Sequence, residues 1–226
     1  MKIDVKQDLL SLNNAVAAEN RALFNSKNLF TINIMGSPGA GKTTLLERLI
    51  TQICNDAVVA VIEGDLATAR DAQRIAACDV PVIQINTDGG CHLDAEMIAK
   101  VVKGFDLAQT DLLLIENVGN LVCPAAFDLG EDLRMLVLSI TEGEDKPGKY
   151  PTAFMAADVV VLNKMDLKDY LDTDTESLIA DILAINHNIK IFSTSCRVGK
   201  LEGMEDLAAY IVDAMRLKKQ GKIKRG

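Results

Sequence analysis

The sequence contains no tryptophan and few aromatic residues of any kind, which make up 4% of its 226 residues. A surface that binds single-stranded nucleic acid stacks the bases on aromatic side chains, so such a surface is not expected here. Lysine and arginine are outnumbered by acidic residues, and the formal net charge is −8. Because nucleic acids attract basic surfaces, these two shortages argue against DNA or RNA as the main partner.

Long apolar segments and a paired set of cysteines are missing as well. No run of about 18 uninterrupted apolar residues occurs, and the opening MKIDVKQDLL lacks the apolar core of a signal peptide. We therefore expect no membrane partner and a cytoplasmic location. The five cysteines are scattered and odd in number, which favours free or metal-bound thiols over a disulfide framework.

The most informative segment that is present is residues 36–43, GSPGAGKT, which fit the phosphate-loop pattern G-x-x-x-x-G-K-[ST] at every fixed position. Glycines let the backbone curl so that its N–H groups point at an anion, and the helix that follows adds the positive end of its dipole. A glycine-rich turn without a ligand is the alternative. We expect the phosphates of a nucleotide to bind Gly36, Ser37, Pro38, Gly39, Ala40, Gly41, Lys42, Thr43 and Thr44.

Apolar runs alternate with amphipathic segments along the rest of the chain. Strands are expected from residue 29 and at 57–62, 81–85, 111–115, 133–140, 159–162 and 190–192, and helices at 4–25, 44–54, 68–77, 91–103, 175–185 and 204–218. This alternation predicts an α/β fold, a three-layer P-loop GTPase domain with a mainly parallel sheet and helices on both faces. We assign residues 1–28 to an N-terminal helix and 29–226 to the GTPase domain, whose basic tail from Lys218 is expected to be solvated.

Residues 163–166, Asn-Lys-Met-Asp, follow one of the apolar runs and resemble the N-K-x-D element that binds guanine. The carboxylate of Asp166 can accept hydrogen bonds from N1–H and the 2-amino group of guanine, and adenine offers neither donor. Asn163 is expected to support the loop and contact N7, and the stem of Lys164 to cover the base. Ser195 and Cys196 lie where GTPases contact the guanine O6 through the backbone. A charged turn without a ligand is the alternative.

Carboxylates at two further strand ends predict the hydrolytic chemistry. Asp65 and Glu116 follow apolar runs, and parallel strands bring their carboxyl ends to one edge of a sheet. Together with Thr43 they are expected to hold Mg²⁺, and with Lys42 they form the predicted catalytic set. Gly119 is expected to donate its N–H to the γ-phosphate. A helix cap for Asp65 and a solvated strand end for Glu116 are the alternatives, and the absence of a strong built-in base predicts slow hydrolysis.

Several other polar side chains are interpreted as structural. Arg70 and Arg74 lie one turn apart on the helix expected after Asp65, and a solvated helix face is favoured over phosphate contact. Cys54 and Cys78 lie in apolar settings, where cysteine usually acts as a small hydrophobic residue.

Cys91, His92 and Cys123 are the candidate metal ligands. Cys91 and His92 are expected to open a helix after a glycine-rich loop, and Pro124 is expected to hold Cys123 extended. Two thiolates and an imidazole suit Zn²⁺ or Ni²⁺. Because three ligands are an incomplete set, either one position stays open for exchange or a two-fold related copy completes it. Buried cysteines without a metal are the alternative.

The motifs GSPGAGKTT, EGDLATARDA, TDGGCHLDA, IENVGNLVCPAAFDLGE and NKMDL, in this order, resemble those of the HypB family of hydrogenase nickel-incorporation GTPases. The resemblance implies binding of GTP and GDP with Mg²⁺, and GTP-dependent delivery of nickel to [NiFe]-hydrogenase large-subunit precursors. It also implies that Cys91, His92 and Cys123 bind Ni²⁺ or Zn²⁺ at the interface of a homodimer that depends on nucleotide or metal. The small metallochaperone HypA is the further partner implied.

The sequence departs from some members of that family. It contains no C-x-x-C-G-C segment and no histidine-rich stretch, so neither high-affinity terminal nickel binding nor nickel storage is expected of these residues. Three alternative functions stay open at this point: nickel insertion into another enzyme such as urease, a GTPase without a metal role, and a small-molecule kinase with the same phosphate loop.

Overall fold

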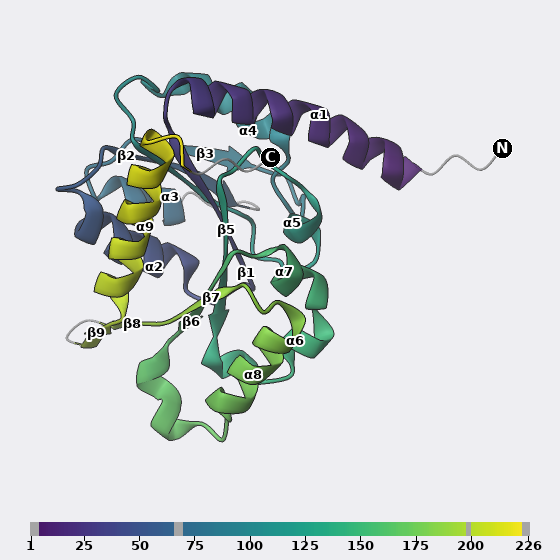
Figure 1. The fold of residues 1–226 in the computed structure, drawn as a ribbon, viewed down its shortest axis with the longest axis vertical. Helices are drawn as coiled ribbons and strands as arrows, with labels where there is room; N and C mark the ends of the chain where they lie inside the picture. Colours follow the sequence, from purple (N-terminus) through teal and green to yellow (C-terminus); the bar gives the residue numbers. More distant parts are fainter. Residues whose placement is uncertain (1–4, 66–69, 198–199, 223–226) are drawn as a thin grey trace.

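The computed structural model describes residues 5–65, 70–197 and 200–222, and its centre is a parallel sheet of seven strands between two layers of helices (Figure 1). All six neighbouring strand pairs are parallel, in the order β3-β2-β4-β1-β5-β6-β7. The predicted fold class is confirmed. The strands are β1 Phe30–Gly36, β2 Val59–Asp65, β3 Val82–Asn86, β4 Leu112–Glu116, β5 Leu133–Ser139, β6 Val159–Asn163 and β7 Lys190–Ser193.

The central strand β1 carries the phosphate loop at its carboxyl end. It is buried along its whole length, Thr31 and Asn33 included, because helices cover both faces of the sheet. Phe30 pairs with Leu112 of β4 and Ile32 with Leu133 of β5, so β1 lies between these two strands. The chain leaves β1 toward β2 on one side and later crosses to β5 on the other. This reversal opens a crevice beyond the strand ends, where ligands of such sheets bind.

Two layers of helices cover the sheet because alternate strand residues face opposite sides. One face packs against α2 Lys42–Ile53, α3 Arg70–Ala76 and α9 Met204–Lys219. The other packs against α1 Val5–Ser26, α4 Ala95–Val101, α5 Cys123–Ala126, α7 Pro151–Ala156 and α8 Thr175–Ile185. The N-terminal helix α1 therefore packs on the body of the molecule, alongside α4 (Figure 1). Within the described ranges, the structure has no helix both long and apolar enough to span a bilayer.

Short helices between β4 and β6 are absent from the sequence-based expectation, and one of them corrects it. Cys123 was predicted to be extended before Pro124, but it is the first residue of α5. Proline is tolerated in the first turn of a helix because the N–H that it lacks has no intrahelical partner there. Proline likewise lies at the start of α6 Lys146–Lys149 and of α7.

The helix expected from Cys91 begins later than predicted. Asp94 is its N-cap and accepts a 2.8 Å hydrogen bond from the backbone N–H of Met97, so α4 starts at Ala95. Cys91 and His92 consequently lie in the loop before the helix, where their side chains are not committed to a helical face.

The C-terminal region differs from the expectation in two respects. An antiparallel hairpin of β8 Ser195–Arg197 and β9 Lys200–Glu202 follows β7 and was not predicted. Lys218 was predicted to be solvated, but its Nζ is buried and donates to the carbonyl of Leu29 at 2.7 Å and to both oxygens of Asp132. Residues 223–226 of the predicted tail, and residues 68–69 of the helix expected at 68–77, lie outside the described part.

Candidate functional site: a nucleotide crevice beside a three-ligand cluster

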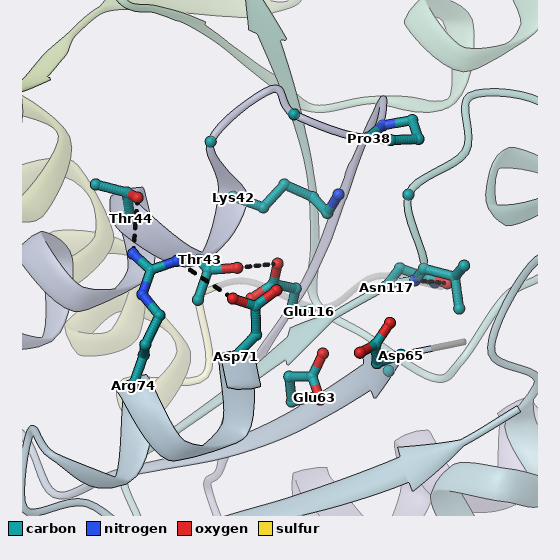
Figure 2. Close-up of a pocket in the computed structure, with 15 residues that line it drawn as sticks. Pro38, Lys42, Thr43, Thr44, Glu63, Asp65, Asp71, Arg74, Glu116 and Asn117 are labelled. Carbon is teal, nitrogen blue, oxygen red and sulfur yellow. Dashed lines mark hydrogen bonds and ion pairs between the residues drawn. The ribbon is translucent and has the colours of Figure 1, made fainter. Parts of the chain in front are cut away.

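The phosphate loop forms one wall of a cavity of about 340 Å³, and the ends of β2 and β4 form the other (Figure 2). Gly41 has φ +94°, and a Cβ there would lie 2.6 Å from Nδ2 of Asn163, so the loop needs glycine at this position. Lys42 is buried, and its Nζ is 3.3 Å from the carbonyl of Gly36 and 3.4 Å from that of Ser37. Burial lowers the pKa of Lys42, and the charge of Glu116 partly opposes this effect. A buried cation whose hydrogen bonds in the described part of the chain go to two neutral carbonyls is matched to an incoming anion.

Carboxylates gather opposite Lys42, at the ends of β2 and β4. Thr43 Oγ1 donates to Glu116 Oε1 at 2.9 Å, and Glu63 is the register partner of Glu116 on the neighbouring strand. The Oε2 atoms of Glu63 and Glu116 are buried and have no hydrogen-bond partner among the described residues. Burial raises the pKa of Glu116 to about 7. It also raises the pKa of Glu63 to about 8, with a further contribution from the charge of Glu116.

These oxygen atoms fit a hard divalent cation. Mg²⁺ prefers carboxylate and hydroxyl oxygens near phosphate, and the unsatisfied Oε2 atoms of Glu63 and Glu116 would gain a partner from it. Asp65 lines the same cavity two residues beyond Glu63, on the same face of β2. Glu63 was missed in the sequence. The available signal was a glutamate inside an apolar strand at the same parity as Asp65.

Helix α3 is joined to the phosphate-loop helix by Arg74, which was predicted to lie on a solvated face. Arg74 is half-exposed, and its Nη2 donates to Thr44 Oγ1 at 2.9 Å (Figure 2). The same atom donates to Glu47 Oε2 at 2.7 Å. Its Nη1 also reaches Asp71, which lines the cavity and was likewise missed. Arg70 is exposed. Both arginines are exposed, in agreement with the predicted solvated face, and Arg74 in addition lines the cavity and forms ion pairs with Glu47 and Asp71.

A second cavity, of about 210 Å³, lies beyond Gly41 between the Asn163–Asp166 segment and the hairpin. Asn163 Nδ2 donates to the carbonyl of Ala40 at 3.0 Å, and Lys164 Nζ donates to that of Gly39 at 2.7 Å. The phosphate loop and the predicted base-binding loop are thus tied together directly. Gly119, in the loop after β4, lines the first cavity beside the phosphate loop.

Within this second cavity the carboxylate of Asp166 is held in place. Ser195 Oγ donates to Asp166 Oδ1 at 2.9 Å, which leaves the second oxygen near Arg197, 4.0 Å away. Thr194, which belongs to the same predicted base-binding segment as Ser195 and Cys196, donates to Asn163 Oδ1 at 3.2 Å. Cys196 lines this cavity. The arrangement presents an oriented carboxylate beside the stem of a lysine.

The three candidate metal ligands come together. One donor atom from each of Cys91, His92 and Cys123 lies within 4.8 Å of the other two, and this is the one such group found in the part of the chain that the structure describes. Cys91 Sγ is 3.5 Å from His92 Nδ1, and the imidazole packs on Phe127 with ring centroids 3.9 Å apart. Burial lowers the pKa of His92, which favours the neutral imidazole that binds metals.

The sheet order, the phosphate loop and the oriented carboxylate of the second cavity define a P-loop nucleotide-binding protein of the α/β class. The family model described as the CobW/HypB/UreG nucleotide-binding domain matches residues 30–193. The chain belongs to the HypB family of hydrogenase maturation factors.

The similarity extends over nearly the whole chain. The hydrogenase maturation factor HypB of Azotobacter chroococcum mcd 1 is 50% identical over 209 residues, which cover 92% of this chain and 68% of that protein. The crystal structure of HypB from Archaeoglobus fulgidus superposes with a TM-score of 0.84 at 38% identity, covering 91% of this chain and 99% of that one. HypB from Helicobacter pylori, solved in complex with nickel, gives 0.85 at 35% identity, covering 95% and 98%.

Proposed function

We propose that this protein is a GTP-binding and slowly GTP-hydrolysing metallochaperone that binds nickel or zinc and assists nickel insertion into [NiFe]-hydrogenase. The observation that carries the proposal is the position of the loop between β4 and α5. Val118 and Gly119 line the phosphate cavity, and the same loop ends at Cys123, whose thiol lies in the three-ligand cluster. The residues that would contact the γ-phosphate therefore lie only a few positions before the candidate metal ligand Cys123 in the chain.

The hydrolytic part of the proposal rests on the phosphate cavity. Lys42 would contact the β- and γ-phosphates, and Thr43, Asp65 and Glu116 would hold Mg²⁺, which neutralises charge on the transferring phosphoryl group. Glu63 would hold water beside these groups. Since phosphoryl transfer is catalysed mainly by positioning and charge, this set supports hydrolysis without a strong base and at a low rate.

The preference for GTP rests on the second cavity. Asp166, oriented by Ser195, would accept from N1–H and the 2-amino group of guanine, and adenine would leave this carboxylate unpaired. The stem of Lys164 would lie over the base. A comparison of GTP and ATP binding tests this preference against the kinase alternative.

The metal part of the proposal rests on the incomplete ligand set. Structural zinc sites have four protein ligands, and Cys91, His92 and Cys123 supply three. We infer that a second copy of the chain completes or covers the site, so that the homodimer depends on nucleotide or metal. The nickel-bound relative from Helicobacter pylori supports nickel as the metal. HypA and the hydrogenase large-subunit precursor are the proposed partners, in the cytoplasm.

Titration of Ni²⁺ and Zn²⁺ into the apo, GDP-bound and GTP-analogue-bound protein tests the proposal, with oligomer size followed in parallel. We expect Cys91→Ala to abolish tight binding and the exposed Cys54→Ala to leave it unchanged. We also expect affinity and dimerisation to differ between the two nucleotide states. Equal affinity in both states, or tight binding by Cys91→Ala, would overturn it. Reconstitution with hydrogenase precursor and with apo-urease separates the two client enzymes.

A further inference from the structure

The side chain of Asn117 links three segments that meet between the nucleotide cavity and the metal cluster. Asn117 is 1% exposed. Its Oδ1 accepts from the backbone N–H of Leu93 and from that of Val118, each at 3.0 Å, and its Nδ2 donates to Asn33 Oδ1 at 3.1 Å. Asn33 belongs to β1, Val118 lines the phosphate cavity, and Leu93 directly follows His92.

Leu93 is well placed to pass a displacement on to His92. Its side chain is fully buried and packs over Gly64, where an added Cβ would lie 2.8 Å from Leu93 Cδ1. Gly64 itself lines the phosphate cavity, between Glu63 and Asp65. The segment that carries Cys91 and His92 is therefore held at one point by the end of β2 and at another by the amide of Asn117. Both points border the place where the phosphates would bind.

The segment that carries Cys123 is joined to the phosphate loop by a different set of hydrogen bonds. The backbone N–H of Asn120 donates to the carbonyl of Gly36 at 3.0 Å, and its Oδ1 accepts from the N–H of Val122 at 2.7 Å and of Cys123 at 3.4 Å. The bonds accepted by Asn120 Oδ1 are local in sequence, and the bond to Gly36 joins this segment to the end of β1. The Asn117–Leu93 hydrogen bond instead joins the loop to the segment that carries Cys91 and His92, 24 residues away.

We propose that Asn117 is a positioning residue that couples the nucleotide state of the β4–α5 loop to the metal ligands Cys91 and His92. The inference rests on the proposed function, because it names the residue through which nucleotide and metal sites communicate. When the loop moves to contact the γ-phosphate, the carboxamide moves with it, and the N–H of Leu93 must follow or lose its acceptor. Since an unpaired buried N–H is costly, the segment that carries Cys91 and His92 moves together with the loop.

A carboxamide serves all three contacts without burying a charge. Aspartate in this position would accept from both N–H groups but would have no proton for Asn33 and would bury a charge. Alanine removes the link altogether. Asn186 supplies a matched control, since its Nδ2 donates to the carbonyls of Phe154 and Ala157. It is not among the described residues that line either cavity or form the three-ligand cluster.

The test is Ni²⁺ affinity measured with GDP and with a non-hydrolysable GTP analogue for wild type, Asn117→Ala and Asn186→Ala. In wild type we expect the two affinities to differ by about 5-fold or more. In Asn117→Ala we expect the ratio to fall to within about 2-fold of unity while the protein still binds GDP and nickel, and Asn186→Ala should keep the wild-type ratio. A wild-type ratio in Asn117→Ala would overturn the inference and leave the proposed function standing. A wild-type protein with no difference would overturn both.

A second measurement avoids substitution and metal. Amide hydrogen exchange at Leu93 in the metal-free wild type should change by about 5-fold or more between the GDP and analogue states, because its acceptor moves with the loop. Unchanged exchange at Leu93 would overturn the inference even if Asn117→Ala fails to fold.

Discussion

Glu63 lies in surroundings that are unfavourable to its charge. It is 2% exposed and sits beside Glu116 on the next strand, and one of its oxygens has no hydrogen-bond partner among the described residues. The neutral acid is therefore the stable form in the absence of a cation, as the pKa of about 8 indicates. Such a group stabilises the fold fully below its unfolded pKa, near 4.5, and loses that contribution as the pH rises through 8.

Because the raised pKa of Glu63 makes the fold less stable as the pH rises, a variant that cannot ionise at this position should escape that loss. In EDTA, the free energy of unfolding of Glu63→Gln relative to that of wild type should be higher at pH 9 than at pH 6 by on the order of 3 kcal/mol. Denaturant unfolding at the two pH values measures the difference. The control is Glu96→Gln on α4, an exposed glutamate whose pKa is lowered by its hydrogen bond to Lys100, and it should show no such gain. An equal effect of Glu63→Gln on the free energy of unfolding at both pH values would contradict the raised pKa of Glu63.

The second prediction concerns the base. Asp166→Asn replaces an acceptor by an amide that also donates, so it pairs poorly with the N1–H and 2-amino donors of guanine but well with the C2 carbonyl of xanthine. GTP affinity should fall by about 100-fold or more, and XTP should become the preferred ligand. Competition binding of GTP, XTP and ATP measures this preference. The control is Asp169→Asn, an exposed residue a few positions later. Retained GTP preference in Asp166→Asn would show that the second cavity does not bind the base.

At the scale of elements, a buried ion pair attaches α9 to the amino end of strand β5. Lys218 and Asp132 have side chains that are 5% and 4% exposed, and the Asp132 carboxylate also accepts from Thr31 at 2.8 Å and 3.0 Å. Removing one partner of a buried pair leaves the other charge without compensation. The neighbouring Lys219 pairs with Asp111 at the surface and is half-exposed.

The third prediction compares the two lysines. Lys218→Ala should lower the free energy of unfolding by about 3 kcal/mol, and Lys219→Ala should lower it by less than about 1 kcal/mol. Urea unfolding of the two variants gives the comparison. Similar losses for both would mean that the Lys218–Asp132 pair does not fasten the helix.

Strands and long helices were predictable from the sequence, and the smaller elements were not. The runs that became β2, β4 and β6 are continuous aliphatic segments buried on both faces, so composition alone identifies them. Helix α8 has its predicted bounds because Asp174 accepts from the N–H groups of Glu176 and Ser177 at its start. The helices α5, α6 and α7 have four to six residues each, too few for a periodic signal.

The candidate site was predictable where a motif marks it and hidden where only packing does. The phosphate loop, the Asn163–Asp166 segment and the cluster of Cys91, His92 and Cys123 are each marked by a short sequence motif, and the structure brings the members of each together. Glu63 and Asp71 were not assigned a role, because nothing local distinguishes them from ordinary polar residues until the strands are aligned. Lys218 shows the same limit, since two adjacent lysines on a helix cannot be told apart until the buried face is known.

At the scale of the whole molecule, the nucleotide site draws on segments far apart in sequence. The cavity residues come from the loop after β1, from the ends of β2 and β4 and from α3, and the second cavity adds β6 and the hairpin. An unfolded chain has no such site, so a bound nucleotide stabilises only the native state.

The fourth prediction uses this linkage. GDP with Mg²⁺ at about 100 times its dissociation constant should stabilise the protein by about 2.7 kcal/mol, which raises Tm by roughly 5–10 °C for a chain of this length. Differential scanning calorimetry measures the shift, with ADP at the same concentration as the control. A shift with ADP equal to that with GDP would contradict the guanine preference.

The central position of β1 has a consequence for synthesis of the chain on the ribosome. Its two neighbours, β4 and β5, are encoded roughly 80 and 100 residues after it. At about 5–20 residues per second, the strand that ends in the phosphate loop waits about 5–20 s for the second of them. During that interval its apolar edges are unpaired and its glycine loop has no cavity. The nascent chain therefore needs protection from aggregation at a stage when it cannot yet be stabilised by bound nucleotide. Substitutions in β5 should consequently lower the yield of folded protein in cells more than they lower the activity of the protein that does fold.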